Sequence, residues 1–159
     1  MSLAADSIFI SAIQSNETLM EKLGYVATTD NDTGTPARLY GTAIGMPEED
    51  AEKNVPVPYA IVTFDGLTND QGTKDDRYES EYDKVEVSIQ LTAKTLDDLH
   101  ELTQMVRKTV LTYLRANTTD IEDYVFRAEG IIYDEKKPCY WQILTYQCDT
   151  INKDDDEQE

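Results

Sequence analysis

The sequence is poor in the residues from which catalytic and metal sites are most often built. It holds one histidine, His100, so neither a pair of histidine metal ligands nor a relay through a second imidazole is available. His100 falls in the second turn of an expected helix, where a solvated position is the ordinary outcome. A phosphate-binding loop, a dinucleotide fingerprint and a nucleophile elbow are all missing. We therefore predict a protein that is not an enzyme, with no catalytic residues and no cofactor or metal site.

Cysteines and long apolar runs are scarce as well. Cys139 and Cys148 are the only cysteines, and nine residues of one strand would separate them by roughly 30 Å. A disulfide requires Cα atoms about 4.4–6.8 Å apart, so we expect two free thiols, in keeping with synthesis in a cytoplasm. Nothing in the spacing places His100 beside either thiol as the base of a nucleophile pair.

The chain also lacks signals for membranes and secretion. No stretch approaches the ~20 apolar residues that a membrane-spanning helix needs. The N-terminal string MSLAADSIFISAIQ has no basic leader and carries Asp6 early. We therefore expect neither a membrane span nor a secretory signal.

Basic residues are strongly outnumbered, with 14 lysines and arginines against 32 acids and a net charge of −18. Such a chain repels nucleic-acid phosphates on average, which disfavours conventional DNA or RNA binding. The charge is concentrated at residues 48–53, 65–83, 120–123 and 149–159, which carry −3, −5, −3 and −5. Solvated connections and a disordered acidic tail over residues 153–159 are the plain interpretation.

Acidic loops raise the question of cation binding. The string from Asp30 to Gly34 faintly evokes a calcium loop, but the twelfth position counted from Asp30 is Gly41 and not an acid. We predict a turn there. Asp75 and Asp76, or Glu48 to Asp50, could supply oxygen ligands, as any acidic loop could, but no second fixed ligand set accompanies them. A small metal-dependent hydrolase is accordingly the least favoured of three functions considered.

The clearest structural signal is a strand followed directly by a helix. From Val85 to Ala93 apolar residues alternate strictly with polar ones, which predicts a strand with one buried face. Thr95 supplies a side-chain oxygen at a helix start, and Asp98, three residues later, completes a capping box. An apolar stripe then follows at steps of three or four. It consists of Leu96, Leu99, Leu102, Val106, Val110 and Tyr113.

The other elements complete an α+β pattern. Residues 4–23 are expected to be helical, with a break near Ser15-Asn16 because both residues prefer caps. Further strands are expected at residues 38–44, 59–64, 124–133 and 139–151. This order predicts an α+β fold: a mostly antiparallel sheet of about five strands with two main helices packed on one face. We expect a single domain over residues 1–152.

The last expected strand is apolar on both faces. Trp141 and Ile143 favour burial of one face, whereas Tyr140, Leu144, Tyr146 and Cys148 favour the other. Either a neighbouring subunit covers the second face, or the chain's own long loops do. The sequence leaves this open.

Taken together, these strings resemble the tail completion, or tail terminator, proteins of long-tailed bacteriophages and prophages. The resemblance covers roughly Ile8 to Ile151. It rests on IFISAIQSNETLMEKLG, VPVPYAIVTFDG, VEVSIQLTAKTLDDLHELTQMVRKTVLTYL and FRAEGIIYDEKKPCYWQILTYQCD. Two departures are a longer linker, Thr28 to Pro58, and the acidic tail after Lys153.

The resemblance implies a structural virion protein, made in the bacterial host cytoplasm and located in the virion tail. Family members form rings, usually hexameric, that terminate the tail tube and join it to the head connector, and DNA passes through the lumen. The implied partners are further copies of the chain, the tail tube protein and the head-tail connector, with no membrane. Acidic loops could line the lumen without holding phosphates. We expect the loop Asp65 to Ser80 and the final strand to make contacts in the assembly.

The alternative function is an acidic DNA mimic that inhibits a basic nucleic-acid-processing partner. Mimicry requires carboxylates in phosphate-like rows on rigid elements. Here the helix is mixed, because its four bases offset its three acids; these are Lys94, Arg107, Lys108 and Arg115 against Asp97, Asp98 and Glu101. Light scattering would separate the two functions, since one predicts a ring and the other a persistent monomer.

Overall fold

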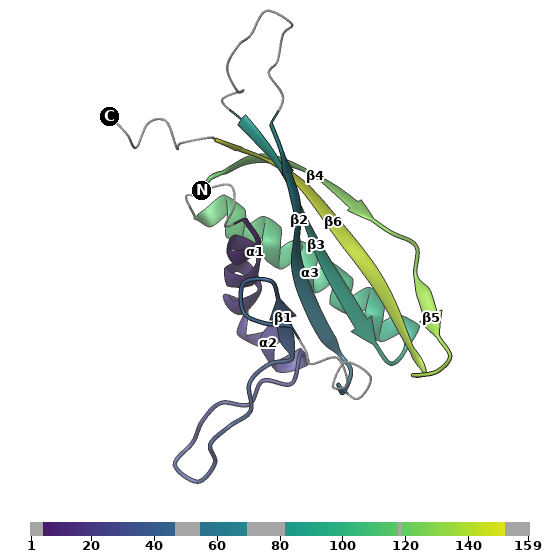
Figure 1. Ribbon diagram of the computed structural model, residues 1–159. Helices are drawn as coiled ribbons and strands as arrows, with labels where there is room; N and C mark the ends of the chain where they lie inside the picture. The colour runs from purple at the N-terminus through teal and green to yellow at the C-terminus, as the bar shows by residue number, and fades with distance from the viewer. Residues whose placement is uncertain (1–4, 47–54, 70–81, 118, 152–159) are drawn as a thin grey trace, which may run out of the picture.

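The computed structural model describes residues 5–46, 55–69, 82–117 and 119–151, and within them it shows three helices and a six-stranded sheet (Figure 1). The elements are α1 (Ala5–Gln14), α2 (Glu17–Lys22), β1 (Leu39–Gly41), β2 (Tyr59–Thr68), β3 (Tyr82–Ala93), α3 (Leu96–Ala116), β4 (Ile121–Ala128), β5 (Ile132–Asp134) and β6 (Cys139–Ile151). The strand order is β1-β2-β3-β6-β4, and β5 also pairs with β6. Only β1 and β2 run parallel, so the predicted α+β class with a mostly antiparallel sheet is confirmed.

The expectation of about five strands was wrong by one. The stretch 124–133, expected as a single strand, is divided between β4 and β5. Ala128 pairs with Leu144 and Ile132 pairs with Trp141, so four steps along this stretch face three steps along β6. The extra residue cannot join the ladder, and it splits the strand in two.

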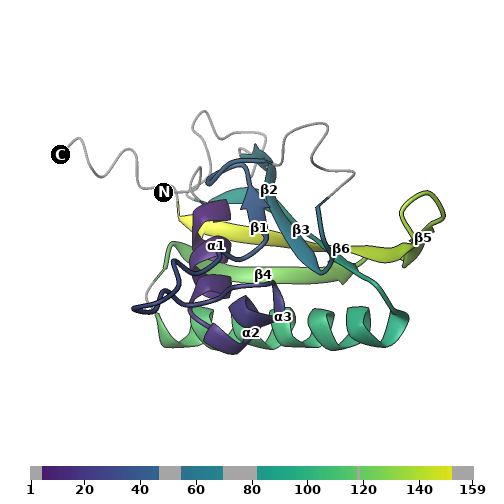
Figure 2. The same cartoon turned by 90° about the horizontal axis from the view of Figure 1, so that it is seen from below.

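All three helices pack against one face of the sheet. That face is formed by alternate residues of the central strands, among them Val85, Val87, Ile89 and Leu91 of β3, all fully buried. The helices contribute the opposite wall of the core, including Phe9, Ile13, Leu19, Leu99 and Val106. Figure 2 shows α3 running along the strands. Leu99, Leu102, Val106 and Val110 of the predicted stripe are buried, whereas Leu96, at the start of the helix, is 41 % exposed. None of the helices in the described ranges is long and apolar enough to cross a membrane.

Both predicted helix starts are confirmed by capping geometry. Asn16 separates α1 from α2, and its side chain accepts a hydrogen bond from the Leu19 N–H at 3.2 Å. The same side chain donates to Thr109 Oγ1 at 2.9 Å, which ties the junction to α3. Thr95 caps α3 by accepting a hydrogen bond from the Asp98 N–H at 3.1 Å.

The strand expected at residues 38–44 is shorter than predicted. β1 ends at Gly41 because the chain turns back there: Gly41 and Gly45 exchange hydrogen bonds of 2.9 and 2.8 Å. Gly45 has φ +107°, a conformation that suits glycine. A side chain at Gly41 would place its Cβ 2.2 Å from the Val62 carbonyl oxygen.

The strand expected at residues 59–64 is longer than predicted. β2 continues to Thr68, with an irregularity between Phe64 and Gly66 in its pairing with β3. The first part of the expected loop Asp65 to Ser80 is therefore strand, and residues 70–80 lie outside the described ranges. The tail at residues 153–159 also lies outside them, and the single domain over residues 1–152 stays a prediction.

Candidate interaction surfaces

The residues with catalytic or metal-binding potential lie apart from one another. His100 is exposed on α3, while Cys139 and Cys148 are buried free thiols, as predicted. Within the described ranges, no three side chains of the His, Cys, Asp or Glu type gather as a metal site. Glu48 to Asp50 and Asp75-Asp76 lie outside those ranges. The string Asp30 to Gly34 forms the expected turn, in which the Gly34 N–H donates to Asp32 Oδ1 at 3.1 Å.

The thiols are held in their protonated form. Burial raises the pKa of Cys148 to about 12, and the negative charge of Asp149 adds to the shift. Burial also raises the pKa of Cys139, with Asp134 acting in the same direction and Lys137 in the opposite one. A thiolate is the nucleophilic form of cysteine, so neither residue is activated at neutral pH.

A groove of about 730 Å³ lies between the α1–α2 junction and the second half of α3. Its floor holds the Asn16–Thr109 hydrogen bond, so both of these polar groups already have a partner. Among the described residues that line it, Glu17 supplies one carboxylate and Lys108 one base. The groove therefore gathers no set of converging acids.

The second face of the sheet, opposite the helices, is partly covered by the chain itself. Val55, Tyr59 and Ile61 form a small buried cluster there, supported by Tyr40 and Val57. The Lys137 side chain fastens this cover, because its Nζ donates to the Val55 carbonyl oxygen and lies 5.0 Å from the centre of the Tyr59 ring. Trp141 and Ile143 lie on the same face and are half-buried. Part of the apolar second face thus finds its cover within one chain.

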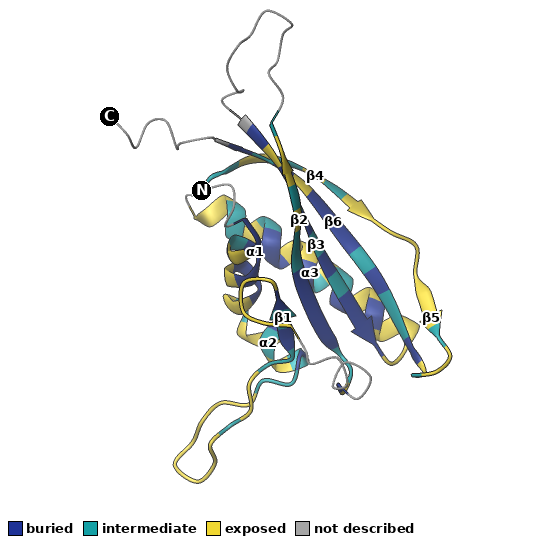
Figure 3. Cartoon of the chain, in the orientation of Figure 1, coloured by how far each residue is buried: buried dark blue, intermediate teal, exposed yellow. Residues whose placement is uncertain are grey.

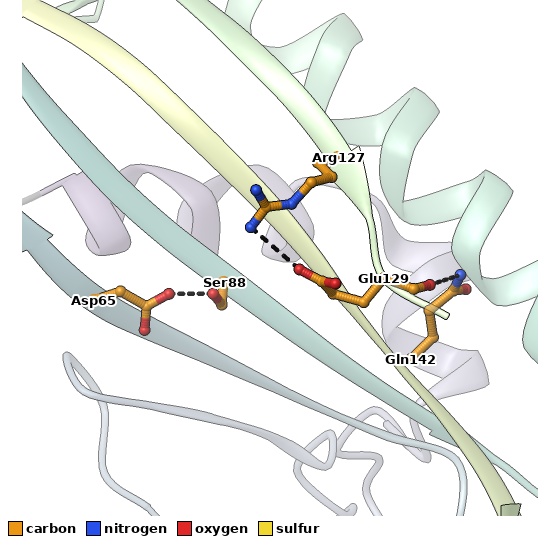
Figure 4. A network of polar contacts seen from close by, with 5 residues as sticks. All are labelled: Asp65, Ser88, Arg127, Glu129 and Gln142. Carbon is orange, nitrogen blue, oxygen red and sulfur yellow. Dashed lines mark hydrogen bonds and ion pairs between the residues drawn. The ribbon is translucent and has the colours of Figure 1, made fainter. Parts of the chain in front are cut away.

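Farther along the second face the side chains are polar and bonded to one another. Asp65 accepts a hydrogen bond from Ser88 Oγ (Figure 4) and another from Thr63 Oγ1 at 3.2 Å. Asp65 is the first residue of the loop that we predicted to make subunit contacts. Its carboxylate is already hydrogen-bonded within its own chain.

The two edges of the sheet differ in construction. On the β1 side the Arg38 N–H donates to the Leu23 carbonyl at 2.8 Å. The backbone N–H and carbonyl groups of Gly41 are hydrogen-bonded to those of Gly45. At the other end of the strand order lies β4, eight residues long. Figure 3 shows exposed colour on β4 and β5, against the buried central strands.

The backbone of β4 directs one set of N–H groups away from the sheet. The Glu129 N–H donates to the Ile143 carbonyl of β6 at 2.9 Å, whereas the Tyr124 N–H is bonded at 2.8 Å to the neighbouring Asp123 side chain. Successive N–H groups along a strand point to opposite edges. The backbone groups of Tyr124 and Phe126 therefore face the open edge.

Exposed apolar side chains lie in the segments at both sides of the sheet. The hairpin patch, defined as Ile131, Ile132 and Tyr133, lies at the start of β5, and these residues are 37, 46 and 50 % exposed. Ile132 and Tyr133 are consecutive strand residues, so their side chains point to opposite faces of the sheet. The flanking patch, defined as Val26, Ile44 and Met46, lies in the segments on either side of β1, and these residues are 50, 49 and 53 % exposed. Figure 1 shows β1 and β5 on opposite sides of the molecule.

Most of the acids expected to line a lumen lie outside the described ranges. Glu122 and Asp123 are exposed on β4, and Asp149 is half-buried on β6. Near the other end of β4, Arg127 forms an ion pair with Glu129 at 3.1 Å, and the Glu129 carbonyl accepts a hydrogen bond from Gln142 Nε2 at 2.8 Å (Figure 4). Local sequence patterns do not predict this polar network, because it depends on the register in which β4 pairs with β6.

Comparison with known proteins gives a limited result. No protein-family model matches the chain, and no curated protein matches it either. Among solved structures, the gp17 protein of bacteriophage SPP1 is similar, with a TM-score of 0.45 and 17 % sequence identity over 95 % of this chain and 91 % of that one. A likeness of this size carries no functional argument.

Proposed function

We propose that this chain is a non-enzymatic structural protein of a phage or prophage tail, which forms a ring that terminates the tail tube and joins it to the head connector. The proposal starts from the sequence resemblance over Ile8 to Ile151. The four strings that carry it fall on α1 and α2, on β2, on β3 with α3, and on β4 to β6. All of these elements belong to one sheet and its helical layer, so the resemblance concerns the body of the fold.

The observation that carries the assembly role is the pair of exposed apolar patches on opposite sides of the sheet. A ring of identical subunits needs head-to-tail contacts between two different surfaces of the chain. The hairpin patch and the flanking patch are the two surfaces that we assign to this contact, since each holds three exposed apolar side chains. In the proposed ring, the hairpin patch of one copy packs against the flanking patch of the next.

Charge sets a condition on this assembly. Each copy carries −18, so copies repel one another at a distance unless salt screens them. The screening length falls to about 8 Å at physiological ionic strength. We therefore expect ring formation to increase with ionic strength between about 0.01 and 0.15 M salt, because apolar contacts persist while repulsion weakens.

The test is particle size by light scattering, together with electron microscopy of the same samples. The wild-type chain, alone or with its tail tube protein, should give discrete rings. The double substitution I132D/Y133D should abolish them by placing charges in the hairpin patch. L96D is the matched control, because Leu96 is 41 % exposed at the start of α3, outside both patches. Rings that survive I132D/Y133D, or a wild-type chain that forms none even on tubes, would contradict the proposal.

The DNA-mimic alternative stays a prediction. Glu101 of α3 is engaged with Lys22 at 3.0 Å, and the Arg107 guanidinium lies 4.2 Å from the centre of the Phe126 ring. The described surface of α3 therefore carries interleaved charges of both signs, which does not favour mimicry. A monomer that binds a basic nucleic-acid-processing protein in the same experiments would favour the mimic instead.

A further inference from the structure

We propose that the open edge of β4 is a self-complementary docking surface for a second copy of this chain. In the proposed dimer, two β4 strands pair antiparallel about a two-fold axis that passes beside Val125, and the two sheets become one. Val125 is the most exposed of the large apolar side chains described, at 66 %. It lies in the middle of an edge strand, which is the usual position from which a sheet extends into another chain.

The backbone alternation restricts the possible registers. Hydrogen-bonded pairs in an antiparallel ladder join residues whose backbone groups point toward each other. In β4 these are the even-numbered residues, because the odd-numbered ones bond to β6, as the Glu129 N–H does. Two-fold registers centred on Tyr124, Val125 or Phe126 satisfy this condition, whereas registers centred between residues do not.

Charge selects one of these three registers. With the axis at Val125, Asp123 of each copy lies opposite Arg127 of the other, and this happens twice. With the axis at Phe126, Asp123 would face Glu129, an acid against an acid. With the axis at Tyr124, Arg127 would face Ile121 and Asp123 would face Val125. Only the first register matches opposite charges and places apolar Val125 against its own copy.

The side chains on the two sides of the edge fit that register. Asp123, Val125 and Arg127 are exposed and share the face opposite the helices, whereas Tyr124 and Phe126 pack on the helical core. Asp123 and Arg127 would form non-hydrogen-bonded pairs, in which side chains lie closest across an antiparallel ladder. Tyr124 and Phe126 would exchange the backbone hydrogen bonds.

In the single chain, Asp123 and Arg127 each make a contact that a second copy could replace. Asp123 Oδ1 accepts a hydrogen bond from the edge-facing Tyr124 N–H at 2.8 Å, so the side chain occupies the place of a missing strand. Arg127 is paired with Glu129, and their side chains are 65 and 47 % exposed. Exposed pairs of this kind contribute little to stability, so exchanging them for contacts across the dimer costs little.

This inference does not rest on the proposed function. A two-fold contact closes after two copies, and a ring requires a head-to-tail contact through different surfaces. The ring test uses the hairpin patch at residues 131–133, and the dimer test uses β4 at residues 123–127. Either can fail while the other holds.

The experiment is a charge exchange followed by sedimentation velocity, over a wide range of protein concentration at about 0.15 M salt, where repulsion is screened. The full wild-type chain should show a concentration-dependent dimer, as a species distinct in mass from any ring that also forms. D123R and R127D should each weaken it roughly tenfold or more, because each puts like charges opposite one another at two symmetric positions. The double variant D123R/R127D should restore the dimer, because it recreates opposite-charge pairs with the signs reversed.

Two further variants separate the proposed contact from general effects. K136D reverses one charge on an exposed turn residue outside β4 and should leave the dimer unchanged. V125K places two ammonium groups together at the axis and should abolish the dimer, while far-ultraviolet circular dichroism shows a folded chain. In the wild-type dimer, the amide hydrogens of Tyr124 and Phe126 should exchange more slowly than in the monomer. A wild-type chain that stays monomeric, or a double variant that fails to recover, would overturn the proposal.

Discussion

The two edges of the sheet differ in what happens to their unpaired backbone groups, which could otherwise pair with another chain. On the β1 side the strand is only three residues long, and the Gly41–Gly45 turn and the Leu23 carbonyl take up backbone groups beside it. On the β4 side an eight-residue strand presents backbone groups outward, and the Tyr124 N–H bonds to the side chain of its neighbour Asp123. An unpaired edge invites another strand. The closed edge is thus taken up within one chain, and the open edge is the one that the proposed dimer uses.

The sharpest test of this difference uses glycine-to-alanine changes at the two sides. Gly41→Ala should lower the free energy of unfolding by about 2–3 kcal/mol, because the new Cβ would lie 2.2 Å from the Val62 carbonyl oxygen and must force the closed edge apart. Gly130→Ala is the matched change in the connection between β4 and β5. Its Cβ meets nothing within 4 Å, and φ at Gly130 is not positive. We expect the free energy of unfolding to stay the same or to rise by up to about 1 kcal/mol.

Urea unfolding followed by circular dichroism measures both values. The comparison depends on the difference between the two variants, since each adds one methyl group. Equal losses at Gly41 and Gly130 would mean that the β1 side is no more tightly built than the β4–β5 connection.

The parts of the fold that follow from the sequence are those with local signals. The alternation from Val85 to Ala93 and the Thr95 cap place β3 and α3 correctly, because strand periodicity and helix capping are written within a few residues. The same holds for the break at Asn16. The prediction of two free thiols follows from the distance between Cys139 and Cys148 along one strand, and both cysteines are free.

The parts that do not follow depend on pairing between distant segments. β2 runs past Asp65 because β3 continues to pair with it as far as Thr68, although a glycine-containing polar string reads as a loop. A glycine within a strand often marks an irregularity in its pairing. Gly66 is therefore the residue from which the irregular continuation of β2 could have been predicted. The division of β4 from β5 arises from register against β6, which no local pattern reveals.

The candidate surfaces were predictable only in part. The sequence indicates that the final strand is apolar on both faces, and Trp141 with Ile143 does lie half-buried on the second face. The alternation Asp123, Val125, Arg127 is visible in the sequence as well. Its self-complementarity has meaning only once β4 is known to end the strand order and its outward backbone groups are known.

A second prediction concerns Cys148, which lies on β6 between the paired residues Val85 and Tyr124. Its pKa is raised from an ordinary value of 9.0 to about 12. Between these values the folded chain keeps the thiol proton and the unfolded chain loses it, so the stabilising contribution is complete below about pH 9 and declines as pH rises. The free energy of unfolding should fall by about 1 kcal/mol between about pH 9 and pH 10 through this group.

Cys148→Ala provides the control. It removes the titrating thiol, so its alkaline loss of stability should be smaller than that of the wild-type chain by the same amount, whatever the substitution does at neutral pH. The pH slope therefore isolates the thiol from the cost of the smaller side chain. If the two slopes coincide, the thiol keeps an ordinary pKa, and strand β4 does not shield this part of β6 from solvent.

The smallest expected effect is at the open edge itself. Arg127→Ala should change the free energy of unfolding of the monomer by less than about 0.5 kcal/mol, because the ion pair with Glu129 is exposed on both sides and such pairs contribute little. The measurement is urea unfolding at a dilution where sedimentation shows only monomer, with Glu129→Ala as the partner variant. A loss near that of Gly41→Ala would mean that Arg127 holds β4 in place within one chain. In that case the side chain would not be available to exchange its partner for Asp123 of a second copy, and the contrast between a closed and an open edge would disappear.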